Sequence, residues 1–370
     1  MNRRIPALLA AGALLASALT ATVATEADAA ATGCGRTGNF TVCTTNPNGA
    51  KDTAIVNELT RQVDATGKGD TIRLAVYYFS LDKPIAPLAD ALAAAEKRGV
   101  DVRAVFGTRN DRPSLNDAVI AKLKNAGASV RQCSAGCLPN SGGTRQGPMH
   151  NRFFLIEKDG APNVLVTSLS FVGSQLTQAH NLLGVHGDRA VFDFYSAYWN
   201  RLYAKSWDGW TDANKGKTGS IAKAWVFPRS ADPVAAELSQ ITACGEGDRV
   251  WVGHANFQSK RPEARAQLDR IQGLGCQVRV VVRSGPTASP GWIEDKLGSA
   301  NVRVHDAHRN KYIVAEAQFG DKHRAVVWTG THNLNGNGLK HSDDNMIRVM
   351  NQTVADRYIA HFQALWSGAH

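Results

Sequence analysis

Two segments decide the fold: His150-Asn151-Arg152 followed by Glu157, and His308-Arg309-Asn310-Lys311 followed by Glu316. Each lies in an apolar run that is typical of a β-strand. The two basic residues and the two glutamates have the same spacing of 159 positions, from 152 to 311 and from 157 to 316. One motif used twice in a chain of 370 residues indicates an internal repeat. Such a repeat can place two half-sites face to face and form one site from both.

The same order of elements surrounds both motifs. A strand, a helix and a second strand come first, then a short strand, the motif strand and an aromatic helix. In the first half the predicted elements outside the motif strand are 71–79, 87–98, 100–106, 129–131 and 192–203. In the second half they are 249–252, 262–274, 277–283, 301–303 and 354–366. Strand, helix and strand in succession predict a parallel sheet with helices on its faces. The predicted fold class is therefore α/β, with two repeats packed in pseudo-two-fold symmetry around one shared cleft.

Composition divides the chain further. A polar, turn-rich stretch precedes the first repeat, and a stretch rich in Gly, Lys, Asp and Asn separates the two repeats. The predicted parts are a signal peptide, an N-terminal extension, a first repeat, a linker and a second repeat, at 1–29, 30–69, 70–206, 207–228 and 229–370.

The first residues are typical of a secretory signal. Arg3 and Arg4 precede an uncharged Ala/Leu-rich stretch at 6–24, and Ala27-Asp28-Ala29 is a small-x-small cleavage site. A transmembrane anchor is the alternative, but alanine and threonine dilute this stretch, and it ends at a cleavage signal. We expect cleavage near Ala29 and a secreted, extracellular protein.

Export gives the six cysteines an oxidising environment, in which disulfides form. Sequence proximity suggests the pairs Cys34–Cys43, Cys133–Cys137 and Cys244–Cys276, although six cysteines allow many other connectivities. A zinc site is disfavoured because the sequence has no Cys-x2-Cys pair. We expect no metal or other cofactor.

The net charge of +10 favours anionic partners, such as phospholipid surfaces, nucleic acid or teichoic polymers, and does not choose among them. Peripheral contact with an anionic membrane surface is one consequence. No run of like charges is long enough for a nucleic-acid-binding tail, so part of this charge can be a solvated face.

The residue types of the motifs suit phosphodiester chemistry. That reaction needs a nucleophile, a proton donor for the leaving alcohol, and cations for the phosphate oxygens. Histidine suits the first two roles, and lysine and arginine suit the third. Residues two apart on a strand point to the same face. His150 and Arg152 are therefore expected to line one wall together.

Segments downstream of both motifs complete the pattern. After the second motif come 327–334, which contains Thr331 and Asn333, and then Asp344. After the first come 166–170, which contains Ser168, and then 178–181. Together these segments resemble the phospholipase D superfamily, whose signature His-x-Lys-x4-Asp is used twice. The resemblance extends from about Asp70 to Trp366.

The resemblance implies a role for each matching residue. His150 takes the position of the nucleophile, which forms a phosphohistidine intermediate, and Asp344 that of the second acid. Glu157 and Glu316 stand where the motif has aspartate. The residues expected to bind phosphate are Arg152, Lys311, Arg309, Ser168, Thr331 and Asn333.

The second motif departs from the signature, because alignment on Lys311 puts Arg309 at the histidine position. Either a β-bulge brings His308 into the site as a catalytic residue, where Asp344 could orient it, or this half has lost its proton donor. In the first half, the acid that should orient the nucleophile is replaced by His180 and Asn181, with Asp188 further on.

The resemblance implies a secreted phospholipase D-type phosphodiesterase that hydrolyses a phospholipid headgroup. Two alternatives stay open: a nuclease of the same fold, and a non-catalytic protein that binds phosphate or an anionic surface. Nucleic acid is the less favoured substrate, because single-repeat nucleases dimerise whereas this chain is duplicated. The duplicated chain is expected to be a monomer.

Overall fold

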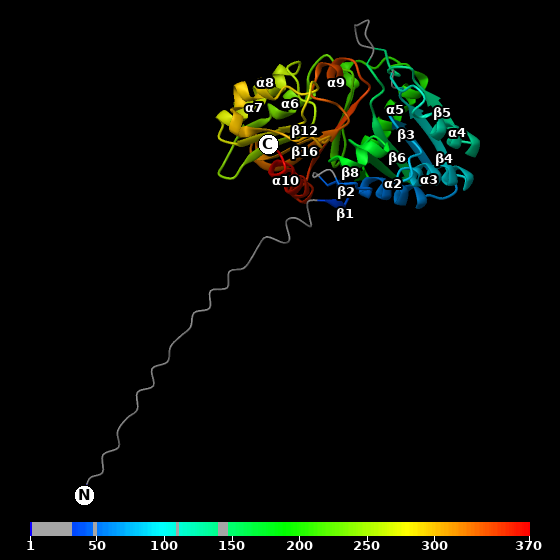
Figure 1. Cartoon of the computed structure of the whole chain (residues 1–370), viewed down its shortest axis with the longest axis horizontal. Helices are drawn as coiled ribbons and strands as arrows, with labels where there is room; N and C mark the ends of the chain where they lie inside the picture. Colours follow the sequence, from blue (N-terminus) through cyan, green and yellow to red (C-terminus); the bar gives the residue numbers. More distant parts are fainter. Residues whose placement is uncertain (2–31, 47–49, 109–110, 140–146) are drawn as a thin grey trace.

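The computed structural model describes residues 1, 32–46, 50–108, 111–139 and 147–370. The predicted signal peptide and its cleavage site lie outside these residues. The described part forms two α/β halves that lie side by side, the first coloured blue to green and the second yellow to red in Figure 1.

Each half contains a sheet, and the two sheets have matching strand orders. The first sheet runs β1 (Gly33–Thr37), β2 (Phe40–Thr44), β8 (Asn181–His186), β7 (Ala161–Thr167), β6 (Arg152–Lys158), β3 (Thr71–Val76), β4 (Asp101–Phe106) and β5 (Ser129–Gln132). The second runs β9 (Gly216–Thr218), β10 (Ala222–Val226), β17 (Asn345–Met350), β16 (Lys322–Gly330), β15 (Lys311–Phe319), β12 (Arg249–His254), β13 (Gln277–Val282) and β14 (Val302–Val304). A further short strand, β11 (Ile241–Ala243), pairs with β15. The predicted two-repeat α/β architecture is confirmed.

The strand directions correct one expectation. β3, β4 and β5 are parallel, as are β12, β13 and β14. The motif strands β6 and β15 and the strands beyond them pair antiparallel. Each sheet is therefore mixed, because short connections join the strands after the motif where a helical crossover would be needed for parallel pairing.

The predicted extension and linker are also parts of the repeats. β2 lies in the extension, is buried, and pairs with β8 along five residues. β10 lies in the linker and pairs with β17 in the same way. The polar composition that suggested separate segments belongs to the turns beside these strands. Each repeat thus begins with its own pair of antiparallel strands, β1–β2 and β9–β10.

Helices cover both faces of each sheet. The outer face of the first sheet carries α2 (Ala54–Asp64), α3 (Ala86–Lys97) and α4 (Asp117–Ala126), and that of the second carries α6 (Pro233–Leu238), α7 (Pro262–Gly273) and α8 (Pro290–Leu297). Between the sheets lie α5 (Arg189–Ala204) and α10 (Gln352–Ser367). Three 3-10 turns (Gly173–Thr177, Asp212–Asn214 and Ser299–Asn301) and the short α9 (Gly336–Lys340) complete the described elements.

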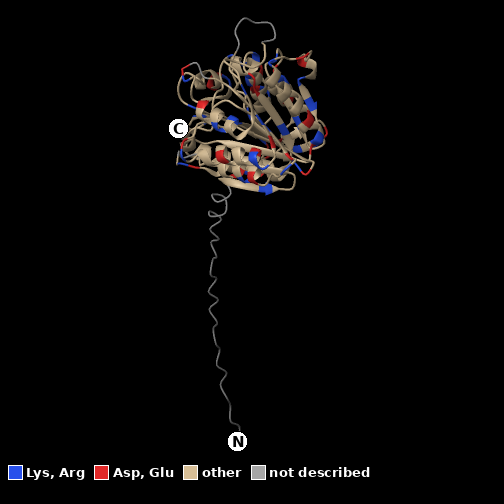
Figure 2. Ribbon diagram, turned by 90° about the vertical axis from the view of Figure 1, so that its right-hand side faces the viewer, with Lys and Arg blue, Asp and Glu red and all other residues tan. Residues whose placement is uncertain are grey.

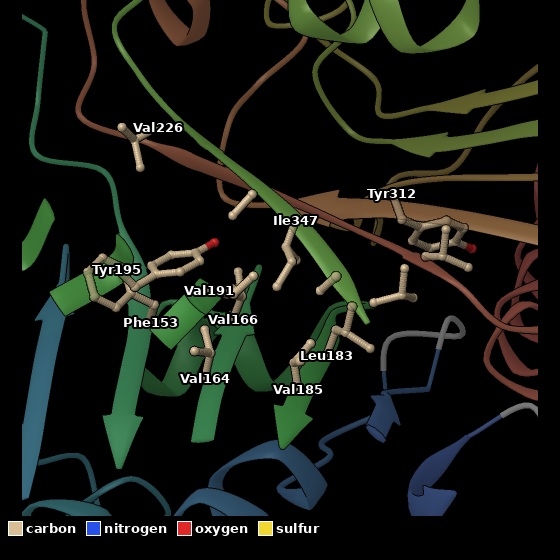
Figure 3. Packing of buried hydrophobic residues seen from close by; sticks show 14 of the residues in the cluster. Phe153, Val164, Val166, Leu183, Val185, Val191, Tyr195, Val226, Tyr312 and Ile347 are labelled. Atoms are coloured by element: carbon tan, nitrogen blue, oxygen red, sulfur yellow. The ribbon is translucent and has the colours of Figure 1, made fainter. Parts of the chain in front are cut away.

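The core between the repeats explains why the motif strands are apolar throughout. On β6, Phe153 and Leu155 point into this inner core, whereas Phe154 and Ile156 point into the outer one. Strands buried on both faces need apolar residues at successive positions. Figure 3 shows Phe153, Tyr195 and Ile347 from the two halves in the same inner core. Packing across this core holds the motif strands of the two repeats together.

The three disulfides predicted from proximity are present: Cys34–Cys43, Cys133–Cys137 and Cys244–Cys276. Cys34–Cys43 joins two residues that face each other across β1 and β2. Among the described residues, no helix has the length and apolar character needed to cross a membrane. Figure 2 shows basic and acidic residues interspersed over the helices and strands.

Candidate active site

The two repeats meet at a histidine–aspartate pair. The His150 Nδ1 atom lies 2.8 Å from the Asp344 Oδ1 atom, so the histidine comes from the first repeat and its carboxylate from the second. The His150 side chain is 13% exposed, and that of Asp344 is fully buried. A parallel bridge between Met149 and Asp343 fixes the backbone immediately before both residues. The pair therefore depends on how the two halves pack together.

The contacts of His150 define its tautomer. The Arg152 Nη2 atom lies 3.1 Å from His150 Nε2, and a guanidinium group can only donate hydrogen bonds. His150 Nε2 therefore accepts, and Nδ1 carries the proton that is donated to Asp344. Burial, followed by the charge of Arg152, lowers the pKa of His150 to about 4 against the opposing effect of Asp344. At neutral pH the ring is neutral, with a lone pair on Nε2.

The second hydrogen bond to Asp344 comes from its own repeat. Thr331 Oγ1 donates to Asp344 Oδ1 over 2.7 Å. Burial alone raises the pKa of this carboxyl, but the ring of His150 and the hydrogen bonds from His150 and Thr331 bring it below its usual value. Asp344 is therefore an anion at neutral pH, as orientation of the protonated Nδ1 requires.

Arg152 forms the wall beside His150, as the strand spacing predicted. Its Nε atom donates to Ser170 Oγ over 2.8 Å, and its Nη1 atom donates to the His150 carbonyl over 3.0 Å. Its guanidinium carbon lies 5.7 Å from the ring centre of Tyr77, which also meets the His150 ring edge to face at 5.2 Å. These contacts fix the arginine where it can bind phosphate oxygens.

Lys311 occupies the corresponding place in the second repeat. Its Nζ atom donates a hydrogen bond to the Asn333 side-chain oxygen, which also accepts from Asn256 Nδ2 over 3.2 Å. Burial, followed by the charge of Arg152, lowers the pKa of Lys311 to about 7, although Asp344 acts in the opposite direction. The ammonium group is therefore close to titration at neutral pH.

A pseudo-two-fold relation connects the two half-sites. The His150 amide donates to the Asp343 carbonyl over 2.9 Å, and the Arg309 amide donates to the Ala179 carbonyl over 3.0 Å. Asp343 immediately precedes Asp344, and Ala179 immediately precedes His180. Arg309 is therefore the structural equivalent of His150, and His180 is the equivalent of Asp344.

His180 repeats the contacts of Asp344 in the first repeat. Its Nδ1 atom lies 3.1 Å from Ser168 Oγ, which parallels the Thr331–Asp344 contact. Burial, then the charges of Arg152, Arg309 and Lys311, hold the pKa of His180 well below its usual value. A second neutral ring thus stands where the first repeat would have its acid. Among the described residues, the contacts of the half-site around Arg309 include no carboxylate.

The possibility that a bulge brings His308 into the site is not realised. The pairing of β12 with β15 runs without a break from Arg249–Glu316 to His254–Lys311. His308 precedes this strand and is fully buried, with Nε2 3.1 Å from the Val281 carbonyl. The expected contact between Asp344 and His308 is likewise replaced by the contact with His150. His308 packs under the strand ends, because strand alternation already assigns the site-facing position to Arg309.

The two motif glutamates lie at the far ends of their strands. Glu157 accepts from Arg189 Nη2 on α5 over 2.6 Å. Glu316 accepts from Gln352 Nε2 on α10 over 2.6 Å and pairs with Arg249 at 3.0 Å. They tie each motif strand to its inner helix. The structure places them outside the group formed by His150, Arg152, Lys311 and Asp344.

Two of the residues expected to bind phosphate have supporting contacts. Ser168 contacts His180, and Thr331 contacts Asp344. Asn333 accepts a hydrogen bond from Lys311, and the charge of Arg309 acts on Lys311. Sequence reasoning missed Ser170 as the partner of Arg152. Ser170 follows Ser168 by two positions, as Asn333 follows Thr331 in the second repeat. That correspondence could have identified it.

Sequence reasoning named Asn181 but missed the buried amide network beneath the site to which it belongs. Asn345 Nδ2 donates to Asn151 Oδ1 over 2.9 Å, which links the repeats, and Asn151 Nδ2 donates to Tyr198 Oη over 3.0 Å. Asn181 Nδ2 donates to Thr329 Oγ1 over 2.7 Å, which is a second link between the repeats. Asn181 and Asn345 each follow the orienting position directly, so alignment of the two repeats could have revealed them.

Comparisons with known proteins agree with this architecture. A family model described as "Cardiolipin synthase, PLD-like domain" matches residues 60–203 and 238–366, which is more than half of the chain. A search of curated protein sequences gives no match.

Two solved structures show the same fold. Phosphatidylserine synthase from Haemophilus influenzae Rd KW20 superposes with a TM-score of 0.59 at 10% identity, over 90% of this chain and 87% of that one. Polyphosphate kinase from Porphyromonas gingivalis superposes with a TM-score of 0.57 at 15% identity, over 86% of this chain. The match spans 49% of the kinase.

Proposed function

Because this chain belongs to the phospholipase D-like family, we propose that it is a secreted phosphodiesterase that hydrolyses a phospholipid headgroup through a phosphohistidine intermediate. The observation that carries the proposal is the pair formed across the repeats by His150 and Asp344, beside the cations Arg152 and Lys311. A neutral ring with an oriented lone pair is a nucleophile, and the adjacent cations can neutralise phosphate oxygens.

The proposed reaction begins when a phosphate displaces the contact between Arg152 and His150 Nε2. The guanidinium group then binds phosphate oxygens, as a planar fork of N–H donors can. His150 Nε2 attacks phosphorus, and the headgroup alcohol leaves. Asp344 stabilises the positive charge that develops on the ring, since it already accepts the Nδ1 proton. Water then cleaves the phosphorus–nitrogen bond.

A phospholipid is the favoured substrate for three reasons. The net charge of +10 suits anionic surfaces. The family model and one of the similar structures carry names of phospholipid-synthesising enzymes. The chain also holds both half-sites, so a monomer can form the site, unlike the single-repeat nucleases that dimerise. Secretion is supported by the signal-like first residues and by three disulfides in the structure.

The test is release of choline or ethanolamine from mixed phospholipid vesicles by the purified mature chain. A chelator is present in one arm to test independence from metal ions. We expect wild-type turnover in both arms and loss of turnover with His150→Ala. A wild type that is inert on vesicles but cleaves an oligonucleotide would instead identify a nuclease. Binding of vesicles without cleavage of either substrate would identify a non-catalytic binder.

A further inference from the structure

Each half-site has one titratable side chain and one permanent cation, two residues apart. Their order along the chain is opposite in the two halves. In the first repeat, the titratable group is His150 and the permanent cation is Arg152. In the second, Arg309 takes the place of His150, and Lys311 takes that of Arg152. Arginine does not give up its proton in proteins, whereas a buried lysine can. Compared with the first repeat, the titratable group of this pair lies two residues later, at Lys311 instead of position 309, so each half has one such group.

Arg309 is held as a cation. Its Nη1 atom donates to the His308 carbonyl over 3.0 Å. Burial, followed by the nearby charge of Arg283, lowers the pKa of Arg309 to about 10, which leaves it protonated at neutral pH. Arg309 can therefore bind a phosphate oxygen but cannot protonate a leaving alcohol.

Lys311 has surroundings that Arg152 lacks. On the neighbouring strand, Val76 faces Arg152, but His254 faces Lys311. In the following turn, Leu169 of the first repeat corresponds to His332 of the second, between Ser168 and Ser170 in one case and Thr331 and Asn333 in the other.

Both of these histidine rings are buried, with relative exposures of 1% and 3%. Their four nitrogens have no hydrogen-bond partner in the described part of the chain. Burial is the first cause of a pKa below the usual value in each, so both rings are neutral at neutral pH. Two neutral, polar rings thus occupy positions next to Lys311 in the fold where the first repeat has Val76 and Leu169.

We propose that Lys311 is the proton donor for the leaving alcohol and that Arg309, at the position of the missing histidine, only binds phosphate. The proposal deepens the proposed phosphodiesterase function and rests on it. The position supports it: Lys311 is 5% exposed, belongs to the half opposite His150, and interacts electrostatically with both Arg152 and Asp344.

The two steps balance as follows. In the first, a bond forms between His150 Nε2 and phosphorus, the bond from phosphorus to the alcohol oxygen breaks, and that oxygen takes a proton from the Lys311 ammonium group. Lys311 is then a neutral amine. In the second, the amine takes a proton from water, the water oxygen bonds to phosphorus, and the phosphorus–nitrogen bond breaks. Both residues return to their starting states.

The experiment uses the mature chain and two lipids that give the same phosphohistidine: phosphatidylcholine and a phosphatidyl p-nitrophenol. The phenolate leaves without a proton, whereas choline needs one. Lys311→Arg keeps the charge but cannot transfer a proton at neutral pH. We expect choline release to fall by roughly 10²–10⁴-fold, the usual contribution of a general acid or base. From the p-nitrophenyl lipid we expect a burst of about one equivalent, then a stall, because the second step has lost its base.

A second variant tests whether lost turnover reflects the missing proton donor or a folding defect. Lys311→Arg combined with Arg309→His restores a titratable group at the position that corresponds to His150. We expect it to regain steady turnover of phosphatidylcholine. His150→Ala is the control that should abolish the burst, and mass measurement of stalled Lys311→Arg should show the lipid phosphate attached to the chain.

The outcomes separate the two proposals. If wild type cleaves neither lipid, the proposed function fails and this inference fails with it. If wild type is active and Lys311→Arg retains steady turnover of both lipids, Lys311 supplies charge alone and only this inference fails. If Lys311→Arg is folded by circular dichroism but shows neither the burst nor turnover, the donor role is also overturned. The reason is that the first step on the p-nitrophenyl lipid needs no proton.

Discussion

At the scale of single residues, the site is set by which neighbour each polar group meets. His150 and His308 belong to near-identical motifs, yet one lies against a carboxylate and a guanidinium and the other against a backbone carbonyl. Burial lowers the pKa of both rings. The difference in their expected roles therefore comes from geometry and not from protonation.

Replacement of Asp344 by asparagine should separate orientation from binding. The variant keeps the shape but removes the anion that holds the His150 proton on Nδ1. We expect kcat for headgroup release to fall by roughly 10²–10⁴-fold with KM little changed, since the group acts on the nucleophile. Glu157→Gln is the matched control, because that carboxylate binds Arg189 away from the site, and it should keep the wild-type kcat. Equal losses in the two variants would contradict this assignment.

Replacement of His308 by alanine should affect stability more than turnover. The change removes a buried ring that hydrogen-bonds the Val281 carbonyl. Loss of such a buried partner costs about 1–3 kcal/mol. We expect a lower urea midpoint with kcat near that of the wild type at a temperature where the variant is folded. A variant that is fully stable yet inactive would place His308 in the reaction.

The protonation states of His150 and Lys311 also predict the pH range of activity. The nucleophile must be neutral, which requires a pH above the His150 pKa of about 4, and the proposed donor must be charged, which requires a pH below the Lys311 pKa of about 7. We expect kcat/KM on phosphatidylcholine to be bell-shaped between these values. A profile that stays flat well above neutral pH would mean that the loss of the Lys311 proton does not limit the reaction.

At the scale of elements, each motif strand has a site residue at one end and its glutamate at the other. Glu157 and Glu316 connect β6 and β15 to α5 and α10, and these two helices fill the space between the sheets. Arg152 and Lys311 lie at the opposite, site-facing ends of these strands. The glutamates therefore make helix contacts away from the chemistry.

The first two strands, β1 and β2, should be indispensable for folding. β2 is buried, extends the first sheet beyond β8, and packs against α10 of the second repeat. A chain that starts after Thr44 would expose the edge of β8 and part of the inner core. We expect that chain to be insoluble or unfolded by circular dichroism, whereas one that starts at residue 32 should fold. A soluble, active chain without β1 and β2 would show that they are an accessory extension.

At the scale of the whole molecule, many histidine rings are buried. Burial lowers the pKa to about 4 for His150, His186 and His361, and to about 3 for His332. Each is neutral in the folded chain at pH values where the unfolded chain binds a proton.

The folded protein should therefore be sensitive to acid. Between pH 6.5 and about 4 the unfolded state binds more protons than the folded state, so stability rises with pH and is lost as pH falls. Each unit of pKa difference contributes about 1.4 kcal/mol per group. We expect the urea midpoint to fall steeply as pH is lowered from 6.5 to 4. A midpoint that does not change over this range would mean that the rings are hydrated in the folded state.

The repeat, the α/β class and the group that contains His150, Arg152 and Lys311 could be predicted from the sequence alone, which also suggested the disulfide pairs found in the structure. These follow from local properties: residue periodicity, proximity along the chain, and a motif used twice at one spacing. Sequence also placed Arg309 at the position of a missing histidine, since strand alternation fixes which side chains share a face.

The contact partners of the site residues depend on the tertiary structure. Asp344 meets His150 from the other repeat, 194 positions away, and His308 is buried away from both. Likewise, β2 and β10 became parts of sheets because β8 and β17 offered free edges to pair with. Contacts between distant segments depend on how the two inner faces pack, and no local pattern encodes that packing.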